Sequence, residues 1–154
     1  MKNNQSDQWN PWTPLLLVPP TPVTWPEYAR QLKRMGVERV FLSAAGLEYN
    51  GDFNLEPWKR YAGLLEKGMR VFNQREIAVG FWFGPTFGWD VLGSDAPFPY
   101  QELIGPGGEP ARGVACPLDA AYQDYLCAAF EIIAGSGVDM ILLEDDFRLH
   151  LREP

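Results

Sequence analysis

Four short apolar runs alternate with three segments of helical periodicity, and this alternation constrains the fold more than any other feature of the chain. The runs are short and bounded by Pro, Gly or charged residues, which is typical of strands. A strand–helix order that repeats three times and closes on a fourth strand predicts a parallel sheet with right-handed crossovers. The predicted strands are 13–20, 37–46, 77–85 and 138–146, and the predicted helices are 24–36, 54–76 and 118–137.

Length and charge narrow the class of protein. The 154 residues predict one domain at 13–154, preceded by a flexible segment at 1–12. A net charge of -7 with scattered basic residues argues against a nucleic-acid partner and against an anionic membrane surface. No run is long enough to span a membrane and no signal peptide is evident, so we expect a cytoplasmic protein. The two cysteines, Cys116 and Cys127, are expected to be reduced, with Cys127 in the core.

Three consecutive acids, Glu144, Asp145 and Asp146, follow the last apolar run directly. In parallel α/β folds the chemistry lies at the carboxyl ends of the strands. On an extended backbone Glu144 and Asp146 share one side and Asp145 takes the other. Crowded carboxylates suit acid–base or nucleophilic chemistry, or cation binding, and Arg148 could neutralise one of them. The alternative is a solvated strand end whose acids cap the next loop.

Aromatic residues crowd the end of the third predicted strand in "GFWFGPTFGWD". Flat aromatic faces beside polar groups are surfaces on which sugar rings pack, so Trp82 and Trp89 are candidates for a sugar platform. Phe81 and Phe83, which alternate with Trp82, are expected to be core residues. Glu48 follows the second strand and could face the acids of the last strand across a pocket, although an ordinary polar turn also explains it.

Some features carry less information. A connection from Thr86 to about Pro117 is longer than most loops, and its aromatics favour a functional loop. Its "GPGGEPARG" stretch lacks the strand–turn–helix context of a phosphate-binding loop, so we interpret it as a plain loop. His150 is the only histidine and is interpreted as incidental. Neither a cofactor nor a metal site is predicted. The alternative is that the acids after the last strand bind Mg²⁺ or Ca²⁺.

Three long stretches of the chain resemble the N-terminal half of a glycoside-hydrolase-like (β/α)8 (TIM) barrel. They are "LLLVPPTPVTWPEYARQLKRMGVERVFLSAA", "VGFWFGPTFG" and "VACPLDAAYQDYLCAAFEIIAGSGVDMILLEDDFRLH". The "CPLD" step is similar to the start of a helix after a long substrate-side loop in such barrels. The strand ending in "EDDFR" is similar to their fourth strand, which commonly carries a catalytic or sugar-binding acid.

The resemblance implies a partial barrel. Four strands and three helices make half of an eight-unit barrel, and the last strand would leave an unpaired edge. The chain is then a truncated product, a half-barrel completed by self-association or by a complementary half, or a small flavodoxin-like open sheet.

The implied function is a glycoside hydrolase-like fragment acting on a carbohydrate. Asp145 or Asp146 would supply one carboxylate, and Glu48 or a residue of the missing half would supply the other. Glu144 and Arg148 would contact the sugar. The alternatives are a non-catalytic carbohydrate-binding remnant and another barrel enzyme. Schiff-base chemistry is disfavoured because Lys33, Lys59 and Lys67 fall on predicted helices.

Overall fold

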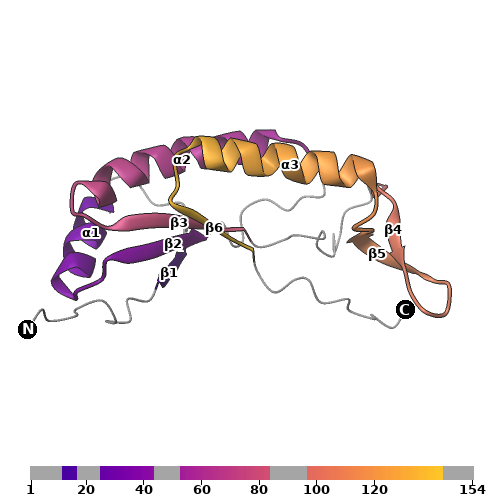
Figure 1. Cartoon of the computed structure of the whole chain (residues 1–154), viewed down its shortest axis with the longest axis horizontal. Helices are drawn as coiled ribbons and strands as arrows, with labels where there is room; N and C mark the ends of the chain where they lie inside the picture. Colours follow the sequence, from indigo (N-terminus) through magenta and orange to yellow (C-terminus); the bar gives the residue numbers. More distant parts are fainter. Residues whose placement is uncertain (1–11, 17–24, 44–52, 84–96, 144–154) are drawn as a thin grey trace, which may run out of the picture.

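The chain forms an open parallel sheet with helices packed on one face (Figure 1). The structure is a computed structural model, and it describes residues 12–16, 25–43, 53–83 and 97–143. The sheet contains, in spatial order, β1 (Thr13–Leu16), β2 (Arg39–Ser43), β3 (Ala78–Phe83) and β6 (Met140–Leu143). The helices are α1 (Trp25–Arg34), α2 (Glu56–Asn73) and α3 (Ala120–Gly135).

Each helix connects two neighbouring strands, and every neighbouring pair of strands in this sheet is parallel. The predicted alternation is therefore confirmed. Strands β2 and β6 begin at Arg39 and Met140, slightly later than expected, and the predicted carboxyl ends of all four strands lie outside the described residues.

All three helices share one core with the same face of the sheet. This core contains Trp25, Ala29, Leu32, Val40, Leu42, Trp58, Tyr61, Leu65, Phe72, Ile77, Val79, Phe81, Phe83, Ala129 and Ile133. The period of two along a strand explains the set, because Val79, Phe81 and Phe83 alternate on β3 and all three are fully buried. The prediction that Phe81 and Phe83 are core residues is confirmed.

The one-sided packing decides between the two expected architectures. A flavodoxin-like sheet carries helices on both faces and has a non-sequential strand order. Here the order follows the chain and the helices α1, α2 and α3 share one face. This arrangement is that of a sector of a (β/α) barrel. Within the described residues the sheet is open, with β1 and β6 at its edges.

The long connection between β3 and α3 contains structure that the sequence analysis missed. Strands β4 (Glu102–Ile104) and β5 (Pro110–Ala115) pair antiparallel in a separate hairpin. Its turn closes with a hydrogen bond from Gly108 N to Gly105 O (3.0 Å), and Gly108 has a φ of +92°. The interpretation of "GPGGEPARG" as a plain loop was therefore wrong, because its glycines supply the turn of a hairpin. Residues 84–96 of the connection lie outside the described part.

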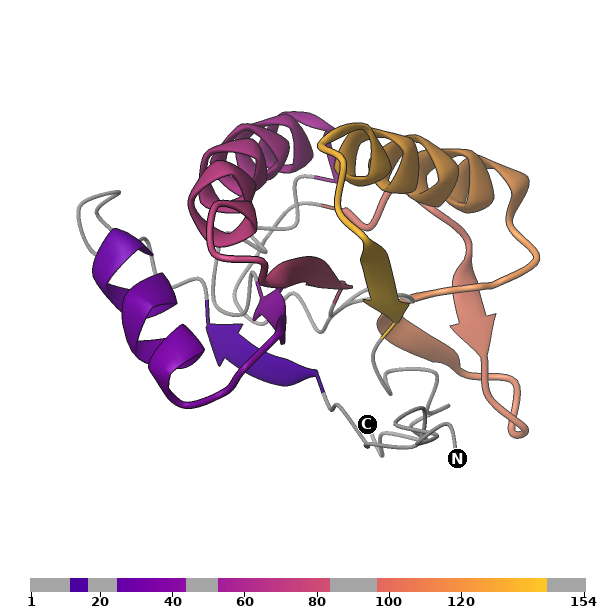
Figure 2. The same ribbon diagram turned by 60° about the vertical axis from the view of Figure 1, so that its left-hand side comes forward.

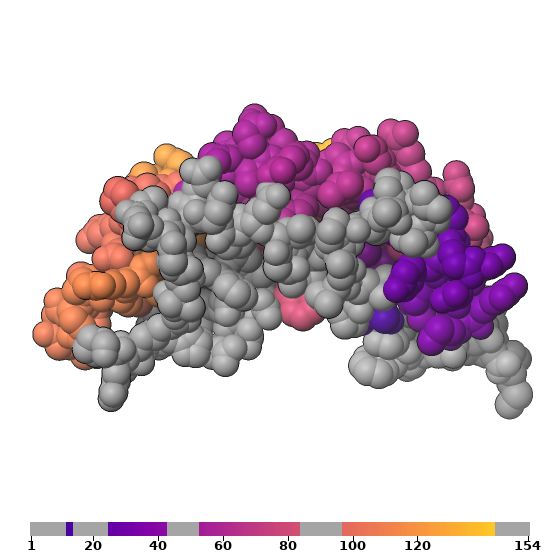
Figure 3. Space-filling view, turned by 180° about the vertical axis from the view of Figure 1, so that it is seen from behind, coloured from indigo at the N-terminus to yellow at the C-terminus, as the bar shows by residue number. Residues whose placement is uncertain are grey.

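The helices form the outer layer of the molecule and pack against one another. Space-filling representation shows α2 (magenta) forming the ridge of the molecule, with α1 (indigo) beside it (Figure 3). Where α1 crosses α2, Trp25 lies against Gly68, and a Cβ at that glycine would be 3.1 Å from the indole.

On α3, Tyr122, Ala129 and Ile133 are buried as the helical period predicts. Cys127 is exposed, so its assignment to the core was wrong: it falls on the opposite side of the helix from Tyr122.

Candidate functional site

The carboxyl edge of the sheet is the expected place for a site, and the structure describes one of the predicted site residues there. That residue is Trp82, near the end of β3. The other candidates lie outside the described residues: Glu48, Trp89, Glu144, Asp145, Asp146 and Arg148.

Trp82 lies on the face of the sheet that α1, α2 and α3 leave uncovered. It alternates with Phe81 and Phe83, which point into the shared core, so its indole projects to the other side. The ring is half-buried. Its Nε1 is buried and has no hydrogen-bond partner within the described part of the chain. A buried N–H without an acceptor costs about 1–3 kcal/mol, so an acceptor that reached this donor would recover that free energy.

The same face carries a second aromatic group nearer the middle of the sheet. Trp12 stacks on Phe41, with ring centroids 4.5 Å apart and an interplanar angle of 24°. The guanidinium of Arg39 lies 5.9 Å from the centroid of the Trp12 ring. Gly80 lies beside this stack, and a Cβ there would be 2.5 Å from Phe41. Together with Trp82, these residues make the helix-free face aromatic where the structure describes it.

A third aromatic group joins the hairpin side of the molecule to α2 and α3. Phe53 lies edge-on to Phe98, Tyr100 and Tyr125, with ring centroids 5.1–5.9 Å apart. Tyr100 also lies 5.0 Å from Tyr122. The helical stripe of α3 identified Tyr122 and Tyr125, but no periodic signal identified Phe53, Phe98 or Tyr100, which come from irregular segments.

The tyrosines of this group are neutral. Burial raises the pKa of Tyr122 and of Tyr125, and the hydrogen bond from Trp58 Nε1 to the Tyr125 hydroxyl (2.8 Å) partly opposes the pKa shift of Tyr125. Burial, followed by the charge of Asp119, raises the pKa of Tyr100. Protonated phenols are neither bases nor nucleophiles at neutral pH, so the group serves packing.

Asp119 holds the hairpin side against the start of α3. As the N-cap, its carboxylate accepts hydrogen bonds from Ala121 N (2.9 Å) and Tyr122 N (3.4 Å). The same side chain accepts from Gln101 N at 2.6 Å, just before β4. The Gln101 amide is the main cause of the lowered pKa of Asp119, and the two helix amides add to it. Its role is structural.

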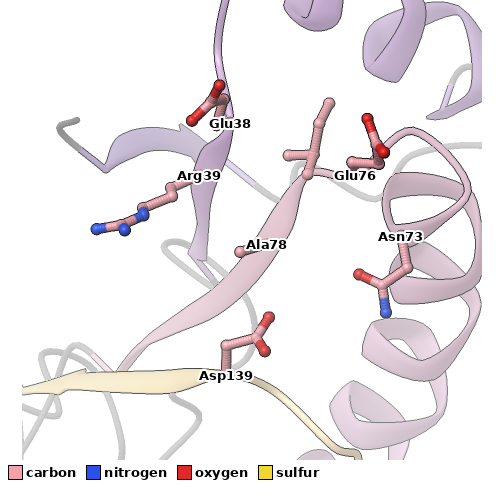
Figure 4. Close-up of a pocket in the computed structure, with 7 residues that line it drawn as sticks. Glu38, Arg39, Asn73, Glu76, Ala78 and Asp139 are labelled. Atoms are coloured by element: carbon pink, nitrogen blue, oxygen red, sulfur yellow. The ribbon is translucent and has the colours of Figure 1, made fainter. Parts of the chain in front are cut away.

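A pocket of about 440 Å³ lies at the opposite end of the sheet, where β2, β3 and β6 begin (Figure 4). Its polar lining includes Glu38, Arg39, Asn73, Glu76 and Asp139. Much of this lining is used by the fold itself: the Asp139 carboxylate accepts from Val79 N (2.9 Å), and Glu76 pairs with Lys33 (3.2 Å). The amino ends of parallel strands are usually a place for stability and not for chemistry. We therefore do not assign the site to this pocket.

Two properties of the described residues bear on the expected partners. No helix among them is long and apolar enough to cross a lipid bilayer. No group of three or more His, Cys, Asp or Glu side chains within the same residues is arranged to hold a metal ion.

Comparison with known proteins yields a distant structural likeness. No family model and no curated protein matches the chain. The fold is similar to the crystal structure of a sugar phosphate isomerase/epimerase from Parabacteroides distasonis, with 12% sequence identity and a TM-score of 0.44. The match covers 85% of this chain and 43% of that one, so this chain spans less than half the length of the solved structure. A likeness at this level carries no argument about chemistry.

Proposed function

We propose that this chain binds a carbohydrate at the carboxyl edge of its parallel sheet, on the helix-free face. The observation that supports the proposal is the state of Trp82: a half-buried ring with a buried N–H that has no acceptor in the described part of the chain. A sugar presents a C–H face that can pack on an indole ring and hydroxyl oxygens that can accept from an indole N–H. One side chain thus offers both kinds of contact, the hydrogen bond once the atoms that cover its N–H are displaced.

The order of residues along the chain supports a site at this edge. Glu48 follows β2, and Glu144, Asp145 and Asp146 follow β6. Both strands run parallel to β3, so chain segments that leave their carboxyl ends start from the edge near Trp82. Trp89, in the segment after β3, would add a second ring surface, and Arg148 and Glu144 would bind hydroxyl groups.

Within this proposal, the finer function is glycoside hydrolysis. The common mechanisms need two carboxyl groups, about 5–5.5 Å apart for retention of configuration and about 6.5–9.5 Å apart for inversion. Asp145 or Asp146 would be one of them. Glu48, or a carboxylate from a further polypeptide, would be the other. The alternative is carbohydrate binding without hydrolysis.

Calorimetric titration with a panel of mono- and oligosaccharides tests the binding. Trp82→Ala removes both the ring and the donor, and we expect at least about tenfold weaker binding. Trp82→Phe keeps an aromatic surface and loses only the N–H, so binding should weaken about fivefold, the equivalent of one neutral hydrogen bond. Tyr28→Ala, an exposed aromatic on α1 away from this face, is the control and should leave affinity unchanged. Unaltered affinity in Trp82→Ala, or no binding to any saccharide, would refute the proposal.

Assays with a panel of nitrophenyl glycosides separate hydrolysis from binding alone. We expect weak or no turnover from this chain by itself if the second carboxylate comes from elsewhere. Weak turnover that Asp145→Asn or Asp146→Asn abolishes would support a hydrolase. Saccharide binding with no turnover of any glycoside would support the non-catalytic alternative. Robust turnover lost in Asp146→Asn would contradict the view that the site needs a further polypeptide.

A further inference from the structure

Charge is divided between the two ends of the helix layer. Residues 25–43 and 53–83 contain nine Lys or Arg and five Asp or Glu, whereas residues 97–143 contain one Arg and six Asp or Glu. Figure 2 shows the helices side by side in the order α1, α2, α3, so the end with α1 and α2 is net basic and the end with α3 and the hairpin is net acidic. The basic residues, which are scattered along the sequence, therefore gather on one part of the fold.

The outward side of α2 carries four of these cations. Its inward side is defined by the buried residues Trp58, Tyr61, Leu65, Gly68 and Phe72. At 100° per residue, the outward side carries Lys59, Arg60, Lys67 and Arg70, all exposed, with Gly63 between them. Lys59 pairs with Glu56, whereas no ion pair in the described part of the chain involves Lys67 or Arg70. We call Lys59, Arg60, Lys67 and Arg70 the α2 basic crest.

The crest weakens α2 when the helix is considered by itself. Lys67 and Arg70 are like charges three residues apart, and such pairs are destabilising. Gly63 lies in the helix interior, where glycine is unfavourable, and a Cβ there would meet nothing within 4 Å, so no packing within the fold requires it. The helix dipole explains Arg70, in the last turn, but not Arg60, near the first turn. Residues that weaken an element without improving its packing are expected where the surface has another role.

We propose that the α2 basic crest binds a short acidic segment of a partner polypeptide, a run of Asp and Glu side chains. Lys59 and Arg70 are 11 residues apart. This separation is about 16 Å along the helix axis at 1.5 Å per residue. An extended chain rises about 3.3 Å per residue, so about five or six residues span the crest. Their carboxylates would accept charge-assisted hydrogen bonds from the Lys and Arg side chains. Because Gly63 has no side chain, the partner's backbone can approach the middle of the crest closely.

The charges around the crest favour a narrow partner over a membrane surface or a nucleic acid. Helix α3 lies beside α2, joined to it by the hydrogen bond from Trp58 to Tyr125, and it exposes Asp124 and Glu131 on its own outward side. Glu66 lies on the side of α2 that faces α3. An extended polyanion that covers the crest would also meet these carboxylates, whereas a single segment on the side of the crest toward α1 avoids them. The net charge of -7 acts at longer range and is screened over about 8 Å at physiological ionic strength, so the local charges decide the contact.

Fluorescence anisotropy of a labelled hexaglutamate peptide tests the proposal on the whole chain. We expect wild-type protein to bind the peptide, and binding should weaken as salt rises from about 50 to about 300 mM, because salt screens exposed charges. Lys67→Glu and Arg70→Glu, made singly, should each raise the dissociation constant at least about fivefold, because an attractive contact becomes repulsive. Arg112→Glu is the matched control: it changes the net charge by the same amount, but at an exposed position of β5 in the hairpin.

Weaker binding by Lys67→Glu and Arg70→Glu, with Arg112→Glu unchanged and normal circular dichroism in all variants, supports the proposal. If a crest variant unfolds, Lys67→Gln and Arg70→Gln take its place, with a smaller loss expected. A wild-type chain that does not bind the peptide overturns the proposal, and so does an equal loss in Arg112→Glu, because overall charge and not the crest would then be responsible.

Vesicles containing phosphatidylserine and a DNA duplex are measured alongside the peptide. Tighter binding to either of them than to the peptide would overturn the proposal, because the crest would then take a different class of partner. Neutral saccharides carry no charge, so none of these outcomes depends on the proposed carbohydrate site.

Discussion

A methyl group added at Gly80 provides a sharp test of packing on the helix-free face. In β3, the Cβ of Gly80→Ala would lie 2.5 Å from both Cδ1 and Cε1 of Phe41 and 3.0 Å from the ring of Trp12. Contacts this short require a shift, and Phe41 has little room because it is only 6% exposed and stacked on Trp12. Overpacking of this kind costs about 1–3 kcal/mol of unfolding free energy.

The measurement is a urea or thermal unfolding curve followed by circular dichroism. For a chain of this size the expected loss corresponds to a Tm lower by roughly 2–12 °C. The matched control is Gly63→Ala in α2, where a Cβ meets nothing within 4 Å. Because glycine weakens a helix interior, Gly63→Ala should be more stable than wild type by about 0.5–1 kcal/mol.

A double-mutant cycle locates the cause. In a Phe41→Leu background the smaller side chain can yield, so the penalty of Gly80→Ala should shrink. If Gly80→Ala is as stable as wild type, or if its penalty is unchanged by Phe41→Leu, then the stack of Trp12 on Phe41 is not held against this glycine and the reasoning fails.

Three further predictions concern α3 and its surroundings. Asp119→Asn keeps an acceptor but loses the charge, so it should remove the part of the pH dependence of folding stability that comes from Asp119. Because the pKa of Asp119 is lowered in the folded chain, its stabilisation of the fold is present above the ordinary carboxyl pKa of about 3.9 and is lost as pH falls through the lowered value. Acid unfolding curves of the variant and the wild type would reveal the difference. Tyr125→Phe removes the acceptor of the Trp58 N–H and should cost about 1–2 kcal/mol in urea unfolding, whereas no change would mean that the 2.8 Å bond contributes nothing. Burial raises the pKa values of Tyr100, Tyr122 and Tyr125. Their contribution to folding stability is therefore intact below the ordinary tyrosine pKa of about 10 and is lost as pH rises from there toward the raised values. Absorbance at alkaline pH should therefore show phenolate forming in two stages, the later one together with unfolding; a single stage near pH 10 would contradict the burial.

Local periodicity was sufficient to predict the elements that repeat. The period of two in β3 identified Phe81 and Phe83 as core residues, and the helical stripe of α3 identified Tyr122 and Tyr125. The strand–helix order predicted a parallel sheet because parallel strands need crossover connections. These features depend on neighbours within a few residues along the chain.

Contacts between distant segments were decided only in the tertiary structure. The hairpin of β4 and β5 was missed because its short strands have no clear period, and its glycines resemble those of any loop. Cys127 is a different case, because its spacing from Tyr122 already places it away from the buried stripe of α3 and its apolar character alone was misleading. The helix-free face around Trp82 follows from all three helices packing on one side, a choice that no local pattern records. Periodicity determines which face of each element is apolar, but only packing determines which of those faces is covered.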